Sequence, residues 1–209
     1  MAWFRRDDKQ EKEVLELLQT VGRLNQENQT LKGELEELRE LVGHQDSDLA
    51  LLIQAASRFR RRTPPKELAE GLLDLSFRPF DLASFYVALV DLKEDSLKFL
   101  LYHEGGRARN HPPRRYSDMP GLTGRAIQSG APLYIRTTQE GQEHGAIFTE
   151  AEKLSGLVPS TWYGIPFGLD GGPLGLVSFQ SFHEDAFGPS RRKIMDALVA
   201  LFHLALELR

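Results

Sequence analysis

Apolar residues recur every seven positions through the first part of the chain, and this repeat constrains the fold more than any other feature. One position of the repeat holds valine or leucine, with an asparagine among them: Val14, Val21, Asn28, Leu35 and Val42. Leucine fills the position three residues later: Leu17, Leu24, Leu31 and Leu38. These are the a and d positions of a coiled coil, and β-branched residues at a with leucine at d favour two parallel strands. The repeat predicts a dimeric leucine zipper over residues 13–45, after a disordered N-terminus at residues 1–12.

Asn28 places an amide in the middle of this apolar seam. In a parallel, in-register dimer the amide can hydrogen-bond its symmetry mate, whereas other arrangements leave it unsatisfied at a cost of about 1–3 kcal/mol. The residue therefore lowers stability and selects register and strand number. Across such a dimer Glu27 would face Lys32 and Glu34 would face Arg39, which are pairs of opposite charge. The alternative is a single amphipathic helix packed on its own globular domain.

The heptad register continues beyond Val42, with Leu49 and Ala56 at a and Leu52 and Phe59 at d. The stretch GHQDSD at residues 43–48 contains a glycine, a polar d residue at Gln45 and potential helix caps. Either one helix runs through with a soft layer at Gln45, or it breaks and restarts there. The unbroken phase favours continuity, and we assign residues 46–62 to a connecting helix.

A basic run follows the zipper in RFRRRTPPK, at residues 58–66. Basic-zipper transcription factors place their basic helix before the zipper, so the order here is reversed. Cations also suit the C-terminal end of a helix. The run is interpreted as helix-end charge, with a surface for an acidic partner or nucleic acid as the alternative. The net charge of −4 does not favour nucleic acid as a partner.

From residue 63 the heptads give way to alternating short elements. PPKELAEGLLDLSF predicts a helix, and ASFYVALVD with SLKFLLYHE predicts an antiparallel hairpin whose first strand is covered on both faces. GLTGRAIQSG predicts a short helix and APLYIRT an edge strand. STWYGIPFGLDGGPLGLVSFQSF predicts a second hairpin, and a helix closes the chain. This order predicts an α+β domain, an antiparallel sheet with helices on both faces.

Three of these segments resemble the GAF domain family: GLTGRAIQSGAPLYI, WYGIPFGLDGGPLGLVSF and HEDAFGPSRRKIMDALVALF. The resemblance covers about residues 47–209, and we assign residues 63–209 to the GAF-like domain. GAF domains are small-molecule sensors or dimerisation modules joined to helices that transmit a signal. The shared glycines and prolines specify fold better than ligand.

The resemblance also limits the ligand, which the sequence leaves unknown. The chain has no cysteine, which argues against covalent bilin attachment and against the free methionine-sulfoxide reductase activity found in one branch of the family. The cyclic-nucleotide motif of the family is not matched by HEDAFG. The scattered histidines predict no metal site. His144 is the best candidate for a single haem ligand, and a solvated loop histidine, which we favour, is the alternative, so haem is not supported. We expect no catalytic residues.

If the domain has a pocket, the resemblance implies that it lies between the sheet and the 105–160 segment. Aromatic and basic residues there form the candidate ligand-binding set: Tyr102, Arg125, Tyr134, His144, Phe148 and Trp162. These residues could stack on a planar ligand, with Arg125 holding an anion. The same aromatics could equally fill a core.

The sequence predicts a cytoplasmic regulatory protein without enzymatic activity. It contains no secretory signal and no transmembrane segment. No output module follows the last helix, so we expect a homodimer whose output is a protein partner and whose GAF-like domain senses a small molecule. The alternative is a ligand-free scaffold whose GAF-like domain serves only dimerisation and docking.

Overall fold

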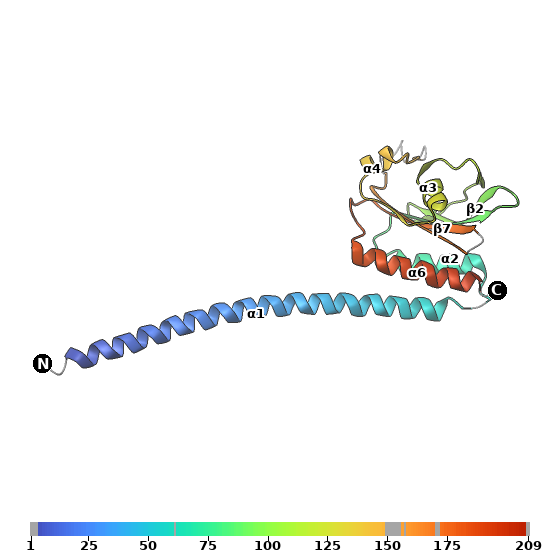
Figure 1. The fold of residues 1–209 in the computed structure, drawn as a ribbon. Coiled ribbons are helices and arrows are strands. Elements are labelled where there is room, and N and C mark those ends of the chain that lie inside the picture. The colour runs from blue at the N-terminus through green and yellow to red at the C-terminus, as the bar shows by residue number, and fades with distance from the viewer. Residues whose placement is uncertain (1–3, 61, 149–155, 157, 170–171, 208–209) are drawn as a thin grey trace. The chain divides into compact units, whose positions relative to one another are not determined.

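The computed structural model describes residues 4–60, 62–148, 156, 158–169 and 172–207, and Figure 1 shows its ribbon. Side chains of the first helix are described over residues 17–36 and from residue 46. The chain divides into two compact units, Met1–Leu49 and Ala50–Arg209. Within the described residues, no helix is both long enough and apolar enough to cross a membrane.

One helix, α1 (Phe4–Arg58), contains the whole heptad repeat. It runs without a break through residues 43–48, so the unbroken heptad phase predicted continuity correctly. The expected disorder over residues 1–12 differs from the structure, in which residues 4–12 are helical. This segment, FRRDDKQEK, is rich in charged and straight-chain residues that lose little rotamer freedom in a helix.

The second unit is built on an antiparallel sheet with the strand order β3-β2-β1-β7-β6-β5, and β4 pairs with β2. The strands have these bounds: β1 Ser84–Asp91, β2 Ser96–Glu104, β3 Arg107–Ala108, β4 Arg114–Arg115, β5 Leu133–Ile135, β6 Thr161–Leu169 and β7 Gly172–Ser181. The remaining helices are α2 Pro65–Ser76, α3 Gly121–Ser129, α4 Thr138–Glu143 and α6 Pro189–Glu207. Both predicted hairpins form, as β1–β2 and β6–β7.

The sheet is covered on both faces, as the alternation in β1 predicted. Figure 1 shows α2 and α6 on one face of the sheet and α3 on the other. Phe85 and Val87 belong to the core shared with α2 and α6, whereas Tyr86 and Ala88 belong to a smaller core shared with α3. A strand buried on both faces carries apolar residues on both, and Phe85–Ala88 are all buried. The fold is therefore the α+β sandwich that the order of elements predicted.

The last turns of α1 belong to this second unit, which begins at Ala50 rather than at the expected residue 63. Ala55 is fully buried and Phe59 is 9% exposed, and both belong to the larger core. The ring of Phe59 meets that of Phe202 in α6 edge-on, with 6.3 Å between centroids. Part of the segment assigned as a connecting helix therefore contributes to the core of the domain.

Candidate functional site

A cavity of about 100 Å³ lies between the α3-side face of the sheet and described residues of the segments 120–148 and 159–160. This is larger than the roughly 15 Å³ that a single water requires. Its floor comes from β1, β2 and β6, and its walls come from the start of α3, from α4 and from the residues that follow α4. It occupies the place that the sequence resemblance implied for a pocket.

The floor of the cavity is aromatic. Tyr86 and Tyr102, on neighbouring strands, stack with 5.5 Å between ring centroids and 3° between planes. Phe99 contacts both rings edge-on. Trp162, on β6, lines the same space and is 8% exposed. Flat aromatic surfaces of this kind suit a planar ligand.

Tyr86 also provides a buried hydroxyl. Its oxygen lies 2.6 Å from the hydroxyl of Thr123 in α3, so the pair links the cavity floor to its wall. Burial raises the pKa of Tyr86, and its hydrogen bond to Thr123 opposes that shift. The phenol therefore stays neutral at physiological pH, as a donor or acceptor inside the cavity.

Among the described residues that line the cavity, Arg114 alone has a charged side chain. Its guanidinium carbon lies 5.8 Å from the ring centroid of Phe99, and its Nη2 lies 3.0 Å from Nε2 of His111. The backbone of Arg114 is held by the pairing of β4 with Leu97 of β2. Ser117 anchors the loop that follows β4. Its N–H and its hydroxyl both donate to the carboxylate of Asp95, at 2.7 and 2.5 Å. This anchored loop brings a positive charge to an otherwise uncharged set of described lining residues.

The wall opposite is formed by α4, whose first turn is capped. Thr137 Oγ1 accepts a hydrogen bond of 3.1 Å from the N–H of Glu140, and the Glu140 carboxylate accepts one of 2.8 Å from the N–H of Arg136. The first bond satisfies a donor that the helix itself leaves free, and the second holds the chain just before the helix. Thr138 donates to Ser160 at 3.4 Å, which closes the wall against the chain before β6.

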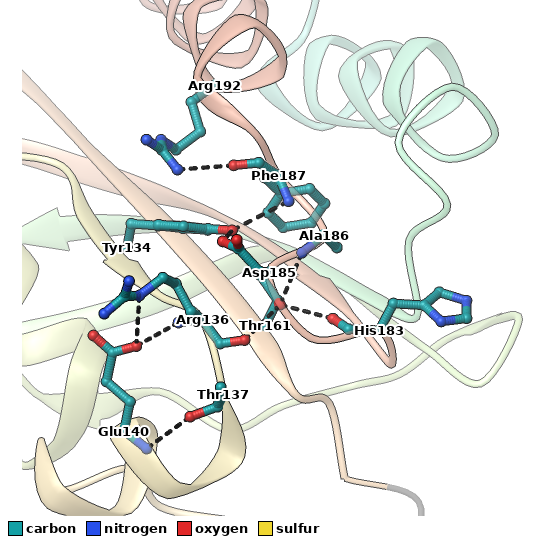
Figure 2. A network of polar contacts seen from close by, with 10 residues as sticks. All are labelled: Tyr134, Arg136, Thr137, Glu140, Thr161, His183, Asp185, Ala186, Phe187 and Arg192. Atoms are coloured by element: carbon teal, nitrogen blue, oxygen red, sulfur yellow. Dashed lines mark hydrogen bonds and ion pairs between the residues drawn. The ribbon is translucent and has the colours of Figure 1, made fainter.

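A polar network fixes the start of β6 and the chain before α6 behind this wall (Figure 2). The Thr161 hydroxyl lies 3.1 Å from the carbonyl of Arg136 and 2.7 Å from that of His183, and it accepts from the N–H of Ala186. The Tyr134 hydroxyl donates to Asp185 at 2.8 Å and accepts from the N–H of Phe187 at 3.2 Å. Burial and the neighbouring Asp185 raise the pKa of Tyr134.

The structure divides the six candidate ligand-binding residues into two groups. Tyr102, Phe148 and Trp162 line the cavity. Arg125 instead lies on the exposed side of α3, where its Nη1 is 2.9 Å from Nδ1 of His144 and donates to the His144 carbonyl at 3.0 Å.

Tyr134 points away from the cavity. It packs edge-on against Tyr163 on the other face of the sheet, under the guanidinium of Arg192, which lies 4.2 Å from its ring centroid. Its neighbour Ile135 lines the cavity instead. The basic residue that does line the cavity, Arg114, was not among the candidates from the sequence.

The predicted dimer interface lies on α1, and its described members are exposed. The exposed fractions are 64% for Leu17, 52% for Val21, 51% for Leu24, 63% for Leu31 and 49% for Leu35. Asn28 is exposed as well. The side chains of Val14, Leu38 and Val42 fall outside the described residues. A stripe of large apolar side chains this exposed is typical of a surface that another molecule covers.

Comparison with known proteins shows the fold. No protein-family model and no curated protein sequence matches the chain. Solved structures do match the chain. One is the GAF domain of an Acinetobacter phosphoenolpyruvate-protein phosphotransferase, which is 11% identical with a TM-score of 0.64. The match covers 76% of this chain and 92% of that one. The corresponding GAF domain from Coxiella burnetii is 14% identical with a TM-score of 0.61, over 78% and 92%.

A third similar structure is the free methionine-R-sulfoxide reductase of Neisseria meningitidis, solved with its substrate. It is 17% identical with a TM-score of 0.60, over 76% of this chain and 87% of that one. The second unit of the chain therefore has a GAF-like fold. At these identities the likeness extends to the fold alone.

Proposed function

We propose that the chain is a non-catalytic, cytoplasmic regulatory protein that dimerises through α1 and binds a small planar anion in the cavity of its GAF-like domain. The observation that carries the ligand proposal is Arg114 at the edge of an aromatic-floored cavity. A planar group would stack against Tyr102, Phe148 or Trp162, and its anionic substituent would reach the guanidinium. The output is contact with a protein partner.

The proposed absence of catalysis is supported by the chemistry of the side chains present. The chain has no cysteine, so it lacks the thiols that the resemblance assigns to the reductase branch. The phenol of Tyr86 is held neutral by burial, and Arg114, the charged group among the described lining residues, offers a guanidinium that binds anions. These groups suit binding better than proton transfer.

The proposed dimer is supported by the exposed stripe of α1 and by the charges beside it. In the single chain Glu27 pairs with Arg23 at 3.0 Å, and both side chains are more than half exposed. Such a pair contributes only a few tenths of a kcal/mol. Glu27 is therefore free to exchange this partner for Lys32 of a second copy.

The experiment is native mass spectrometry of protein purified from its own host, followed by thermal-shift assays on ligand-free protein. The probes are small aromatic carboxylates and phosphates, each matched with its neutral amide or alcohol. We expect a retained small molecule or a rise in melting temperature with the anions, lost in Arg114→Gln.

Arg125→Gln is the matched control, because Arg125 lies outside the cavity and its loss should leave the shift intact. An empty dimer that no probe stabilises would contradict ligand binding. That result would favour the scaffold, in which the stacked rings of Tyr86 and Tyr102 simply fill the smaller core.

A further inference from the structure

The end of α1 presents two apolar faces, and the domain covers one of them. Ala55 and Phe59 are buried in the larger core, with Leu51 and Leu52 packed at its edge. Arg58 strengthens the attachment through an ion pair of 2.7 Å with Asp74 in α2. In the heptad register Leu52 and Phe59 are d residues. Their own domain therefore occupies the positions that a continued zipper would need.

The other face remains exposed and apolar. Leu49 and Ile53 are both 58% exposed, and they lie four residues apart on one side of the helix. Ala50 and Ala56 are exposed beside them and are small enough to let another helix approach closely. Large apolar side chains this exposed on a helix already packed on its opposite face indicate a second interface.

We infer that this face pairs with the same segment of a second copy, through a seam that shifts from the d position to the e position after Leu49. The inference rests on the proposed parallel dimer. Because the zipper stripe lies on the same continuous helix, an in-register dimer brings the two copies of Ile53 to the same level. Among the described side chains of α1, the seam then runs through Leu49, Ile53 and Ala56.

This seam has a different period from the zipper. The step from Leu49 to Ile53 is four residues, whereas the heptad pattern calls for three between an a and the next d. Such a displacement is a stutter, which locally unwinds a left-handed supercoil. The two helices therefore run straighter near the domains. The change of phase allows each helix to pack against its own domain on one face and against the partner helix on another.

Cysteine cross-linking tests the inference directly, because the natural chain has no cysteine. Single-cysteine variants Leu31→Cys, Leu52→Cys, Ile53→Cys and Gln54→Cys are oxidised mildly in the whole chain, and the covalent dimer is followed with time. A disulfide needs Cα atoms within about 7 Å, which only facing seam positions provide. Gln54 is the control, since it is exposed on the same turn but lies off the seam.

We expect Leu31→Cys and Ile53→Cys to cross-link at least about tenfold faster than Gln54→Cys, because only they hold paired thiols in reach. Cross-linking at Leu31 with Ile53 no faster than Gln54 would overturn the shifted seam and leave the dimer standing. A failure to cross-link at Leu31 would overturn the parallel dimer itself. Rapid cross-linking of Leu52→Cys in place of Ile53→Cys would instead show an unshifted heptad seam.

Discussion

Gly164 determines how Trp162 lies in the cavity floor. The two residues are on the same face of β6, two positions apart. A Cβ at Gly164 would overlap the six-membered ring of the Trp162 indole, so the ring lies flat against the glycine. Any other residue at 164 would require the indole to move from this position.

We predict that Gly164→Ala destabilises the domain by about 1–3 kcal/mol, the usual cost of forcing a side chain out of a packed position. Chemical denaturation followed by near-ultraviolet circular dichroism measures this. Gly188→Ala is the control, because a Cβ at Gly188 would meet nothing within 4 Å. Equal stabilities of the two variants would show that the indole does not rest on Gly164.

His103 makes stability depend on pH. Its ring packs edge-on against Phe77 at 5.0 Å, and its Nδ1 is buried with no hydrogen-bond partner among the described residues. Burial lowers the pKa of His103 below its ordinary value. The unfolded chain then binds the proton more readily than the folded one, so this histidine destabilises the fold as pH falls through the unfolded pKa of about 6.5.

We predict that His103→Gln reduces the loss of unfolding free energy between about pH 7.5 and pH 5. Above pH 7.5, where the imidazole is neutral in both states, the two proteins should show the same dependence on pH. Chemical denaturation of both proteins at several pH values across this range measures the difference. A wild-type loss that persists undiminished in the variant would assign the dependence to other groups.

At the scale of elements, α4 depends on its capping threonine. Thr137→Ala removes the acceptor for the Glu140 N–H and should cost this short helix about 1 kcal/mol. Hydrogen exchange measures the effect at the amides of Gly141 and His144, whose hydrogen bonds to Thr137 and Glu140 form the helix. Thr137→Ser keeps the hydroxyl and should retain protection. Loss of protection in both variants would point to packing of the threonine methyl instead.

The zipper has its own test in Asn28. We predict that Asn28→Val raises the melting temperature of the helical signal while broadening the distribution of oligomers, because the apolar seam gains a residue and loses its register. Sedimentation velocity follows the distribution, and Gln26→Ala, on the outer face, should leave it unchanged. The same sharp dimer in wild type and Asn28→Val would contradict the prediction.

Long elements with a clear period were predictable from sequence, and the short elements α3 and β5 were predicted as well, but the faces that short strands present were not. The repeat of α1 and the two-sided alternation of β1 predicted both elements because each pattern extends over several residues. In the three-residue strand β5 a shift of one position exchanges the two faces of the strand. The local sequence therefore did not predict that Tyr134 points away from the cavity and Ile135 points toward it. Arg114 reaches the site through a two-residue strand and the Asp95–Ser117 contacts, which join residues distant in sequence.

At the scale of the whole molecule, the two compact units should unfold separately. An intermolecular coiled coil is stabilised by mass action, whereas a folded domain is not. We predict two thermal transitions, a helical one whose midpoint rises with protein concentration and one in the GAF-like unit that does not move. Far- and near-ultraviolet circular dichroism at several concentrations separate them. Two fixed midpoints would contradict dimerisation through α1, and one coincident transition would show that the units unfold together.

The position of Trp162 gives the protein an internal optical reporter. The chain has two tryptophans, and Trp3→Phe would leave Trp162 as the single indole. That indole is 8% exposed and forms part of the cavity floor. Its emission would change when a molecule enters the cavity and displaces water from the ring, so occupancy could be followed by fluorescence without labelling the protein.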